Sequence, residues 1–206
     1  MTERRRLAQQ LGVVAGFDDP RIDLEQYRTP PDLAAHLVHV AAIHDDIAGE
    51  TVLDLGCGTG MLTLASALAG AQLSVGIELD AGALVTASEN ETRVGAQGDI
   101  DWVRADATRP PLSCSDATVV MNPPFGARDG NEHADRAFLA AARDLAAVSY
   151  SIHNAGSHDF VESFVADEGG EVTHAFAAEF DVSSQYDHHN EATRTLDTEL
   201  FRICWD

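Results

Sequence analysis

The amino-acid sequence predicts an α/β fold, with helices covering both faces of a mostly parallel sheet. Three observations support this prediction. Short apolar segments alternate with longer helix-like segments, which is typical of parallel strands joined by helices. A glycine-rich turn at 54–60 directly joins one strand-like segment to a helix-like one. Two strand-like segments then follow each other near the end of the chain, which indicates an antiparallel hairpin at one edge of the sheet.

The elements are expected in a regular order along the chain. Pro30, Pro31 and Asp32 suit the start of a helix over 33–43. The apolar, β-branched segment 51–55 predicts a buried strand. Together these segments predict a Rossmann-like, doubly wound sheet of seven strands. The other expected helices are 61–69, 81–90, 135–147 and 159–167, and the other expected strands are 73–77, 100–104, 117–121, 148–152, 172–180 and 195–204.

Length and composition indicate one folded domain. The chain has 206 residues, of which 45% are hydrophobic, enough to bury a core. We expect a single domain over 1–206, with a helical extension in 1–45 and the catalytic core in 46–206. No apolar run could span a bilayer, and the start lacks a signal-peptide core, so we expect a cytoplasmic protein without membrane contact. The three cysteines form no CxxC pair, so no metal site is predicted.

The charge balance is strongly acidic. Asp and Glu together number 34 against 13 basic residues, all of them Arg, which gives a net charge of −21. Taken alone, this balance argues against a nucleic-acid partner, because polyanion binding usually requires a basic surface. A diffuse carboxylate excess without Lys resembles proteins of salt-loving organisms, in which concentrated salt screens the repulsion. We therefore expect a halophilic source.

The string DLGCGTG at 54–60 predicts a small-molecule site. Glycines let a backbone approach a ligand closely, and ligands of open α/β sheets bind beyond the carboxyl ends of the strands. A dinucleotide fingerprint would need a third glycine where this chain has Met61. The arrangement DxGxGxG resembles the class I S-adenosylmethionine-dependent methyltransferases instead. An isolated glycine turn would mean little, but here Glu78 and Asp106 follow the next two strands.

The resemblance implies the class I methyltransferase fold and S-adenosyl-L-methionine as cofactor. It implies that Asp54 and the glycine backbone surround the methionine part. Glu78 would bind the two ribose hydroxyls, since a carboxylate can accept both hydrogen bonds, and Asp106 would meet the adenine amino group. The cofactor-binding residues expected from the family are Gln26, Tyr27, Thr29, Asp54, Gly56, Cys57, Gly58, Gly60, Glu78, Leu79, Asp106, Ala107 and Asn122.

The sequence VVMNPPFG at 119–126 predicts the catalytic residues. It resembles the [DN]PP[YFW] signature of methyltransferases that modify a nitrogen conjugated with a π system. The lone pair of such a nitrogen is delocalised, so the nitrogen must be turned toward the methyl group. The Asn122 side-chain oxygen and the Pro123 carbonyl can accept its hydrogens. Pro124, together with Pro123, makes the backbone of this turn rigid, and Phe125 offers a ring on which a base can stack. Without the glycine loop, NPPFG would be read as a plain turn.

The segment LEQYRTPPDLAA at 24–35 resembles the methyltransferase-like protein five family of archaea and eukaryotes. Those enzymes make N6-methyladenosine in small-subunit ribosomal RNA. The resemblance implies that Gln26, Tyr27 and Thr29 close over the cofactor. It also implies a small zinc-binding activator subunit that adds a strand to the edge strand 100–104. Trp102 would anchor that subunit, or would simply pack under a helix.

RNA contacts are expected from a few arginines. Where the family is basic, the stretch 184–194 has two acids and one Arg, so His188 and His189 could bind RNA, a metal or nothing. Two alternatives stay open: an N-methyltransferase acting on a release-factor glutamine, on guanine or on DNA, and a non-catalytic cofactor-binding partner. The residues expected to contact substrate RNA are Arg28, Arg104, Arg109, Arg128 and His153.

Overall fold

The computed structural model describes the backbone of residues 2–96, 98–124, 134–183 and 193–206. Side chains are described over the same ranges except 179–183 and 193–196. The predictions made above for Phe125, Arg128, His188 and His189 lie outside these residues.

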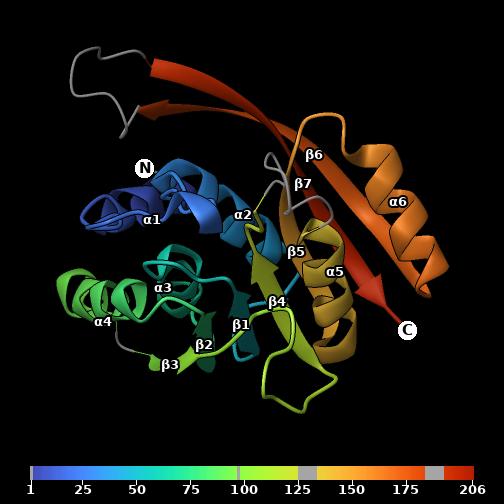
Figure 1. Ribbon diagram of the computed structural model, residues 1–206, viewed down its shortest axis with the longest axis horizontal. Coiled ribbons are helices and arrows are strands. Elements are labelled where there is room, and N and C mark those ends of the chain that lie inside the picture. The colour runs from blue at the N-terminus through green and yellow to red at the C-terminus, as the bar shows by residue number, and fades with distance from the viewer. Residues whose placement is uncertain (1, 97, 125–133, 184–192) are drawn as a thin grey trace.

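Helices and strands alternate along much of the described chain, which begins with two α-helices and ends with two strands (Figure 1). The helices are α1 (Glu3–Leu11), α2 (Pro31–Ile43), α3 (Met61–Leu68), α4 (Ala81–Val94), α5 (Ala134–Leu145) and α6 (His158–Asp167), with a 3-10 turn at Ile22–Leu24. The strands are β1 (Thr51–Leu55), β2 (Leu73–Glu78), β3 (Asp99–Arg104), β4 (Ala117–Met121), β5 (Ala146–Asn154), β6 (Gly170–Ser183) and β7 (Thr193–Trp205).

The strands form one seven-stranded sheet in the order β3-β2-β1-β4-β5-β7-β6. The first five run parallel, whereas β7 runs antiparallel to both β5 and β6. This confirms the predicted mostly parallel sheet with a C-terminal hairpin. The strand order reverses between β1 and β4, where Leu55 lies opposite Met121. The loops that follow these two strands therefore start side by side, at the place where ligands of doubly wound sheets bind.

Helices cover both faces because the strands present apolar side chains to both. Val52 and Val120 pack in a cluster with α1, α2 and α3. Their neighbours Leu53 and Val119 belong to the cluster that includes α5 and α6. Successive strand residues point to opposite faces, so β1 and β4 are apolar nearly throughout.

Local signals explain both ends of α4. The Asp80 side chain accepts a hydrogen bond from the Gly82 backbone at 2.9 Å and caps the start of α4. Gly95, which follows the last helical residue, Val94, caps its end with φ +68°. Several expected boundaries are shifted: helix 81–90 continues to Val94, and the last three strands are longer than expected at both ends. The predicted helix 135–147 ends at Leu145, and β5 begins at Ala146, which pairs with Ala117 of β4. Pairing with β4 there outweighs the helical preference of alanine.

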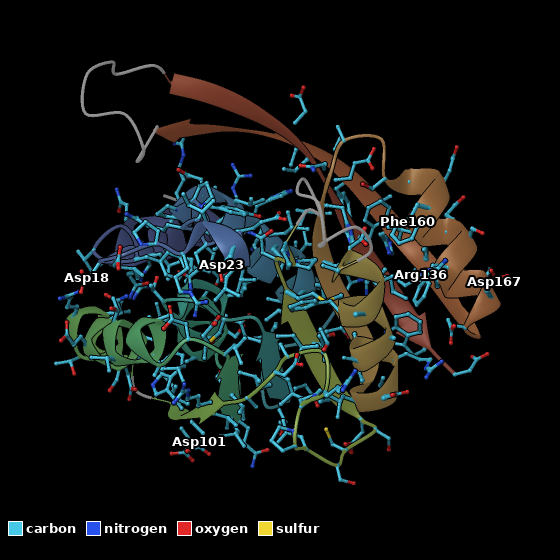
Figure 2. The ribbon with its side chains drawn as sticks, viewed as in Figure 1. Asp18, Asp23, Asp101, Arg136, Phe160 and Asp167 are labelled. Carbon is cyan, nitrogen blue, oxygen red and sulfur yellow. The ribbon has the colours of Figure 1, made fainter. Side chains whose placement is uncertain are left out.

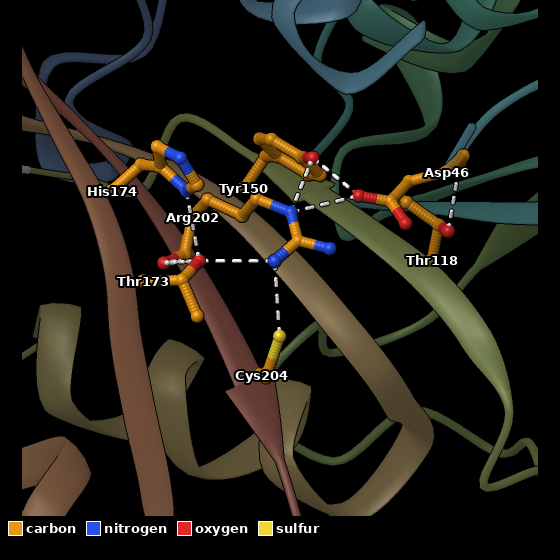
Figure 3. Close-up of polar contacts among 7 residues, drawn as sticks. All are labelled: Asp46, Thr118, Tyr150, Thr173, His174, Arg202 and Cys204. Atoms are coloured by element: carbon orange, nitrogen blue, oxygen red, sulfur yellow. Dashed lines mark hydrogen bonds and ion pairs between the residues drawn. The ribbon is translucent and has the colours of Figure 1, made fainter. Parts of the chain in front are cut away.

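A polar cluster joins the C-terminal hairpin to the loop before β1 (Figure 3). Arg202 on β7 donates hydrogen bonds to the Asp46 carboxylate, the Tyr150 hydroxyl and the Thr173 hydroxyl, at 2.9, 2.9 and 3.0 Å. The Thr118 hydroxyl donates to the Asp46 backbone carbonyl at 2.6 Å. These contacts attach residues of β4, β5, β6 and β7 to one loop.

Exposed acidic residues lie on several separate parts of the fold. Asp18, Asp101 and Asp167 are exposed and lie on separate parts of the chain (Figure 2). Arg136 of α5 lies instead over the Phe164 ring of α6, with its guanidinium carbon 5.2 Å from the ring centroid. No helix in the described ranges combines the length and hydrophobicity needed to cross a membrane.

Candidate active site

A cavity of about 340 Å³ opens at the carboxyl ends of β1, β2 and β4. Its volume is within the range typical of small-molecule sites. The N-terminal segment 17–29 forms part of its wall. Of the predicted cofactor and catalytic residues, those that line this cavity are Gln26, Tyr27, Thr29, Asp54, Gly56, Cys57, Gly58, Glu78, Leu79, Asp106, Ala107, Asn122 and Pro124.

The glycine turn after β1 is packed between two aromatic rings. Gly56 has φ +73° and Gly58 has φ +54°, the left-handed region that favours glycine. A Cβ at Gly56 would lie 3.0 Å from the Phe138 ring, and one at Gly58 would lie 2.8 Å from the Phe17 ring. A side chain at either position would also narrow the cavity that both glycines line.

Gly60 serves a different purpose from the one predicted. It does not line the cavity but is the N-cap residue that precedes α3, with φ +89°. A Cβ there would lie 2.6 Å from the Trp102 ring, and a Cβ at Gly76 would meet the same ring at 2.6 Å. The indole N–H of Trp102 donates to Glu91 of α4 at 2.9 Å. Trp102 therefore packs inward against two glycines, under a helix.

Asp54, at the end of β1, is buried with one oxygen still available. Its Oδ2 accepts hydrogen bonds from the Thr63 backbone and hydroxyl at 2.8 and 2.7 Å. Its Oδ1 is buried and has no hydrogen-bond partner. Burial raises the pKa of the Asp54 carboxyl to about 7, although the Thr63 bonds act in the opposite direction. An unpartnered carboxylate oxygen in a cavity wall suits a ligand with a cationic donor.

Glu78, at the end of β2, is held by two backbone donors. Its Oε2 accepts from the Gly58 N–H at 3.0 Å, and its Oε1 accepts from the Asp80 N–H at 2.9 Å. Only 8% of Glu78 is exposed. Each carboxylate oxygen has two acceptor sites, so one on each oxygen is still available to a ligand diol.

Asp106, just after β3, lies at the rim of the same cavity. Its Oδ1 accepts hydrogen bonds from the Thr108 hydroxyl and backbone at 2.7 and 2.9 Å. These bonds lower the pKa of the Asp106 carboxyl below its usual value. Asp106 is therefore an ionised acceptor at neutral pH.

Gln26 connects the N-terminal segment to the end of β2. Its side chain is 6% exposed, accepts from the Arg21 N–H at 2.7 Å and donates to the Asp80 carboxylate at 2.9 Å. Phe17, which belongs to the same segment, lies against the glycine turn that follows β1. Segment 17–29 is thus attached to the first two strand ends that form the cavity.

The same segment holds the side chain of Asn122, the first residue after β4. The Tyr27 hydroxyl donates to Asn122 Oδ1 at 3.0 Å, and Asn122 Nδ2 donates to the Thr29 hydroxyl at 3.0 Å. Burial raises the pKa of Tyr27, so it is a neutral donor across the physiological range. Tyr27 and Thr29 line the cavity, and they also contact the predicted catalytic residue.

The predicted RNA-contacting residues are placed differently from one another. Arg28 lines the cavity, and its Nε is buried without a hydrogen-bond partner. Arg104 and Arg109 are exposed and lie outside the cavity lining, although Arg104 Nε donates to the Leu79 carbonyl at 3.3 Å. The prediction that His153 contacts RNA directly is wrong. Its side chain is 2% exposed, because it packs edge-on against Phe201 and bonds Ser151 inside the sheet.

The sequence motifs gave no indication of two aromatic residues in the cavity wall. Phe138 lies on α5 and was assigned no role, and Phe17 lies in a stretch without a motif. Both lie against the glycine turn. The positive φ of Gly56 and Gly58 shows why the turn needs glycine, but only the packing shows which rings face it.

The hydrogen-bond acceptors around the cavity fit the expected cofactor. Asp54 Oδ1 is an unused buried acceptor, Glu78 keeps two acceptor sites, and both residues line a cavity at the strand-order reversal. The residues present fit a ligand with a cationic amino group and a ribose diol. The fold and the site together define a class I, S-adenosylmethionine-dependent methyltransferase. A family model described as "Methyltransferase small domain" matches residues 31–149, and the chain belongs to that family.

Several known proteins resemble the whole chain. The rRNA N(6)-adenosine-methyltransferase Mettl5 of Drosophila melanogaster is 36% identical over 97% of this chain and 95% of its own length. The METTL5 enzyme of Danio rerio is 31% identical over 97% of each chain. The crystal structure of PH1948 from Pyrococcus horikoshii superposes with a TM-score of 0.89 at 34% identity, covering 100% of this chain and 98% of that one.

A more distant likeness concerns the fold alone. Magnesium protoporphyrin IX methyltransferase from Synechocystis PCC 6803, solved with bound S-adenosylmethionine, has a TM-score of 0.66 at 18% identity. The superposition covers 84% of this chain and 78% of that one. That methyltransferase and this chain therefore share a fold.

Proposed function

We propose that this methyltransferase transfers a methyl group to N6 of an adenine in small-subunit ribosomal RNA. The observation that supports the chemistry best is Asn122 beside the cofactor cavity, with its amide held by two hydroxyls. The substrate class comes from the relatives named rRNA N(6)-adenosine-methyltransferases, which match nearly the full chain. Asn122 and Pro124, both at the cavity, agree with a planar amino nitrogen as acceptor.

S-adenosylmethionine supplies the electrophilic methyl group. Glu78 would hold its ribose hydroxyls through the two acceptor sites that the backbone leaves available. Asp54 Oδ1 would accept from its amino group and balance its charge. Asp106 would accept from its adenine amino group, and Leu79 and Ala107 would pack against the base. Gly56, Cys57 and Gly58 would provide a wall without bulky side chains toward the ligand.

The acceptor nitrogen is oriented by groups on this chain. The Asn122 oxygen and the Pro123 carbonyl accept the two amino hydrogens, which turns the lone pair away from the ring and toward the methyl carbon. Both acceptors stabilise the positive charge that develops on nitrogen. The proton is acidic once the nitrogen is alkylated, so no basic side chain of unusual pKa is required. Stacking on Phe125 belongs to this proposal and lies outside the described residues.

Arg28 is the best-placed cation for the RNA backbone. It is half-buried at the cavity, and burial lowers the pKa of its guanidinium. A buried guanidinium nitrogen without a partner is costly, and a phosphate oxygen would satisfy it. Arg104 and Arg109, which are exposed after β3, would contribute longer-range attraction.

A zinc-binding activator subunit is the expected protein partner. Strand β3 pairs with β2 and, within the described ranges, is the terminal strand of the sheet. Such an edge has backbone donors and acceptors to which another strand can bind. Because Trp102 packs inward, the exposed backbone of Asp99–Arg104 is the better candidate for the contact than the indole.

One variant tests the proposed function. Asn122→Ala should abolish methyl transfer to small-subunit RNA, assayed with the activator subunit present, while S-adenosylmethionine binding changes little. Asn154→Ala is the matched control, since Asn154 is an exposed asparagine at the end of β5. Mass spectrometry of small-subunit RNA from cells without the gene should show a lost N6-methyladenosine. Normal methylation by Asn122→Ala, or an unchanged RNA, would contradict the proposal.

A further inference from the structure

Both ends of the Asn122 amide are bonded to hydroxyls of one short segment. Tyr27 O–H donates to Oδ1 and Thr29 Oγ1 accepts from Nδ2, each at 3.0 Å. Tyr27 and Thr29 come from a segment 95 and 93 residues earlier in the chain. This contact joins two parts of the molecule that the motifs describe separately.

The orientation of this amide matters for the proposed chemistry. The two ends of an asparagine amide are nearly equal in size, but the oxygen only accepts hydrogen bonds and the nitrogen only donates them. A rotation of 180° would present N–H groups to the amino hydrogens of the substrate. Donor would then face donor, and the acceptor on which the reaction depends would be lost.

We propose that Tyr27 and Thr29 are positioning residues that hold the Asn122 amide with its oxygen available to the substrate amino group. The proposal rests on the proposed function and assigns these side chains a task besides enclosing the cofactor. Thr29 provides an acceptor for the nitrogen, and Tyr27 provides a donor for the oxygen. Neither hydroxyl has to touch the substrate.

The Tyr27 bond leaves the catalytic acceptor usable. A carbonyl oxygen has two acceptor sites, of which Tyr27 occupies one. The raised pKa of Tyr27 means that the hydroxyl keeps its proton at the working pH, so it is always a donor. A deprotonated oxygen would instead favour the reversed amide. The neutral phenol therefore selects one of the two orientations.

The segment is attached on both sides of these residues, so the two hydroxyls are held in place. Gln26 donates to Asp80 at 2.9 Å immediately before Tyr27. Helix α2 begins at Pro31, two residues after Thr29, and several of its side chains are fully buried in the core. Groups held in this way lose little entropy on orienting Asn122, which makes the arrangement preorganised.

A double-mutant cycle with Asn122→Asp tests the proposal. Aspartate has two equivalent acceptor oxygens, so it has no amide orientation to select, and Asp is allowed in the [DN]PP[YFW] signature. With Asn122 present, Tyr27→Phe should lower kcat for RNA by about tenfold, the effect of one lost orienting hydrogen bond. With Asn122→Asp present, the same change should lower kcat by less than about twofold. The KM for S-adenosylmethionine should stay within about twofold throughout.

Two results would overturn the proposal. An equal loss of kcat in both backgrounds would mean that Tyr27 acts on the cofactor or the fold, and not through the amide. Unchanged kcat for Tyr27→Phe with Asn122 present would mean that the Tyr27 hydroxyl does not select the orientation of the Asn122 amide. Thr29→Ser is the conservative control, because it keeps the acceptor and should retain activity, whereas Thr29→Val should not.

A second measurement does not depend on activity. In 1H–15N spectra, the Asn122 side-chain protons should exchange slowly with water in the native chain and faster in Thr29→Val. No difference would overturn the proposal even if Asn122→Asp proves too slow to assay. Slow exchange in a chain that methylates no adenine would instead refute the proposed function and leave the positioning contact established.

Discussion

The guanidinium of Arg202 on β7 forms an ion pair with the carboxylate of Asp46, at 2.9 Å between Nε and Oδ2. Asp46 lies in the loop between α2 and β1, 156 residues earlier. Both side chains are only 15% exposed. Because β7 lies between β5 and the edge strand β6, this pair attaches the C-terminal hairpin to the parallel part of the sheet.

Removing Arg202 should therefore destabilise the whole fold. Arg202→Met keeps much of the volume but leaves the Asp46 carboxylate without its cation in a site of low exposure. The free energy of unfolding should fall by about 3 kcal/mol, measured in urea. Arg93→Met is the control, because its pair with Glu89 on α4 is well exposed and should be worth less than about 1 kcal/mol. Equal effects of the two changes would contradict a special role for Arg202.

Cofactor affinity should depend on pH through Asp54. The pKa of this carboxyl in the free protein is about 7, above its ordinary value of 3.8 because of burial. Below that pKa the group is mostly neutral, and above it the carboxylate attracts the cationic amino group of S-adenosylmethionine. Affinity should rise between pH 5.5 and pH 7, by at most about tenfold per pH unit, and then level off.

Isothermal titration calorimetry can test the direction of this pH dependence of cofactor affinity. Binding near pH 6.5 should release a proton, which appears as a binding enthalpy that depends on the buffer. Asp54→Asn should bind more weakly and lose the proton release. Folding stability should depend on pH in the opposite direction to cofactor affinity. Between about pH 4 and pH 7 the native state keeps the Asp54 proton that the unfolded chain has lost, so the Asp54 contribution to stability decreases as the pH rises through this range. Proton release that persists in Asp54→Asn would point to another group.

Gly60 should be intolerant of a side chain because of Trp102. Gly49 and Gly60 have similar positive φ values, +83° and +89°, but a Cβ at Gly49 meets nothing within 4 Å. Gly49→Ala should cost about 1 kcal/mol of stability from its backbone conformation. Gly60→Ala should cost about 3 kcal/mol, because the Cβ would lie 2.6 Å from the indole. Chemical denaturation measures both costs.

The Trp102 contact has its own test. In a Trp102→Leu background, Gly60→Ala should cost little more than Gly49→Ala, since the ring that a Cβ would meet is gone. An unchanged cost in that background would mean that the cost at Gly60 comes from its backbone conformation or from Ala87, whose Cβ would lie 3.3 Å away, and not from the indole.

Arg28 should contribute to RNA affinity in a salt-dependent way. Arg28→Met should weaken binding of small-subunit RNA several-fold and reduce the slope of log affinity against log salt by about 0.7, as expected for one lost phosphate contact to a single strand. Arg143→Met is the control, because Arg143 is already paired with Asp144 and Glu168. Fluorescence anisotropy at several salt concentrations measures both. An unaltered slope would mean that Arg28 does not contact an RNA phosphate.

The net charge of −21 should make the fold dependent on salt. Screening of carboxylate repulsion predicts that the melting temperature rises as KCl increases from 0.1 to 2 M. Scanning calorimetry at each concentration tests this, with sucrose as a control that does not screen charge. A melting temperature that falls with KCl would contradict the halophilic interpretation.

The alternation of segments was sufficient to predict the sheet and its hairpin. Strands buried on both faces read as continuous apolar runs, and this pattern located β1 and β4 correctly. The glycine turn and Asn122 follow those strands, so their place at the cavity could be inferred from chain order alone. The end of α5 was missed, since the residues Ala146 and Ala147 favour a helix and only pairing with β4 makes them a strand.

Side-chain partners distant in the chain could not be predicted in this way. No pattern indicates that Tyr27 bonds Asn122, that Trp102 fills the space beside Gly60, or that His153 is buried against Phe201. Periodicity reports which residues face the core, and motifs report which residues follow a strand. The choice of partner depends on strand order and helix packing, which bring together groups that are far apart in the chain. The chemistry of the site was therefore readable in the residues, whereas the orientation of its central amide came from the fold.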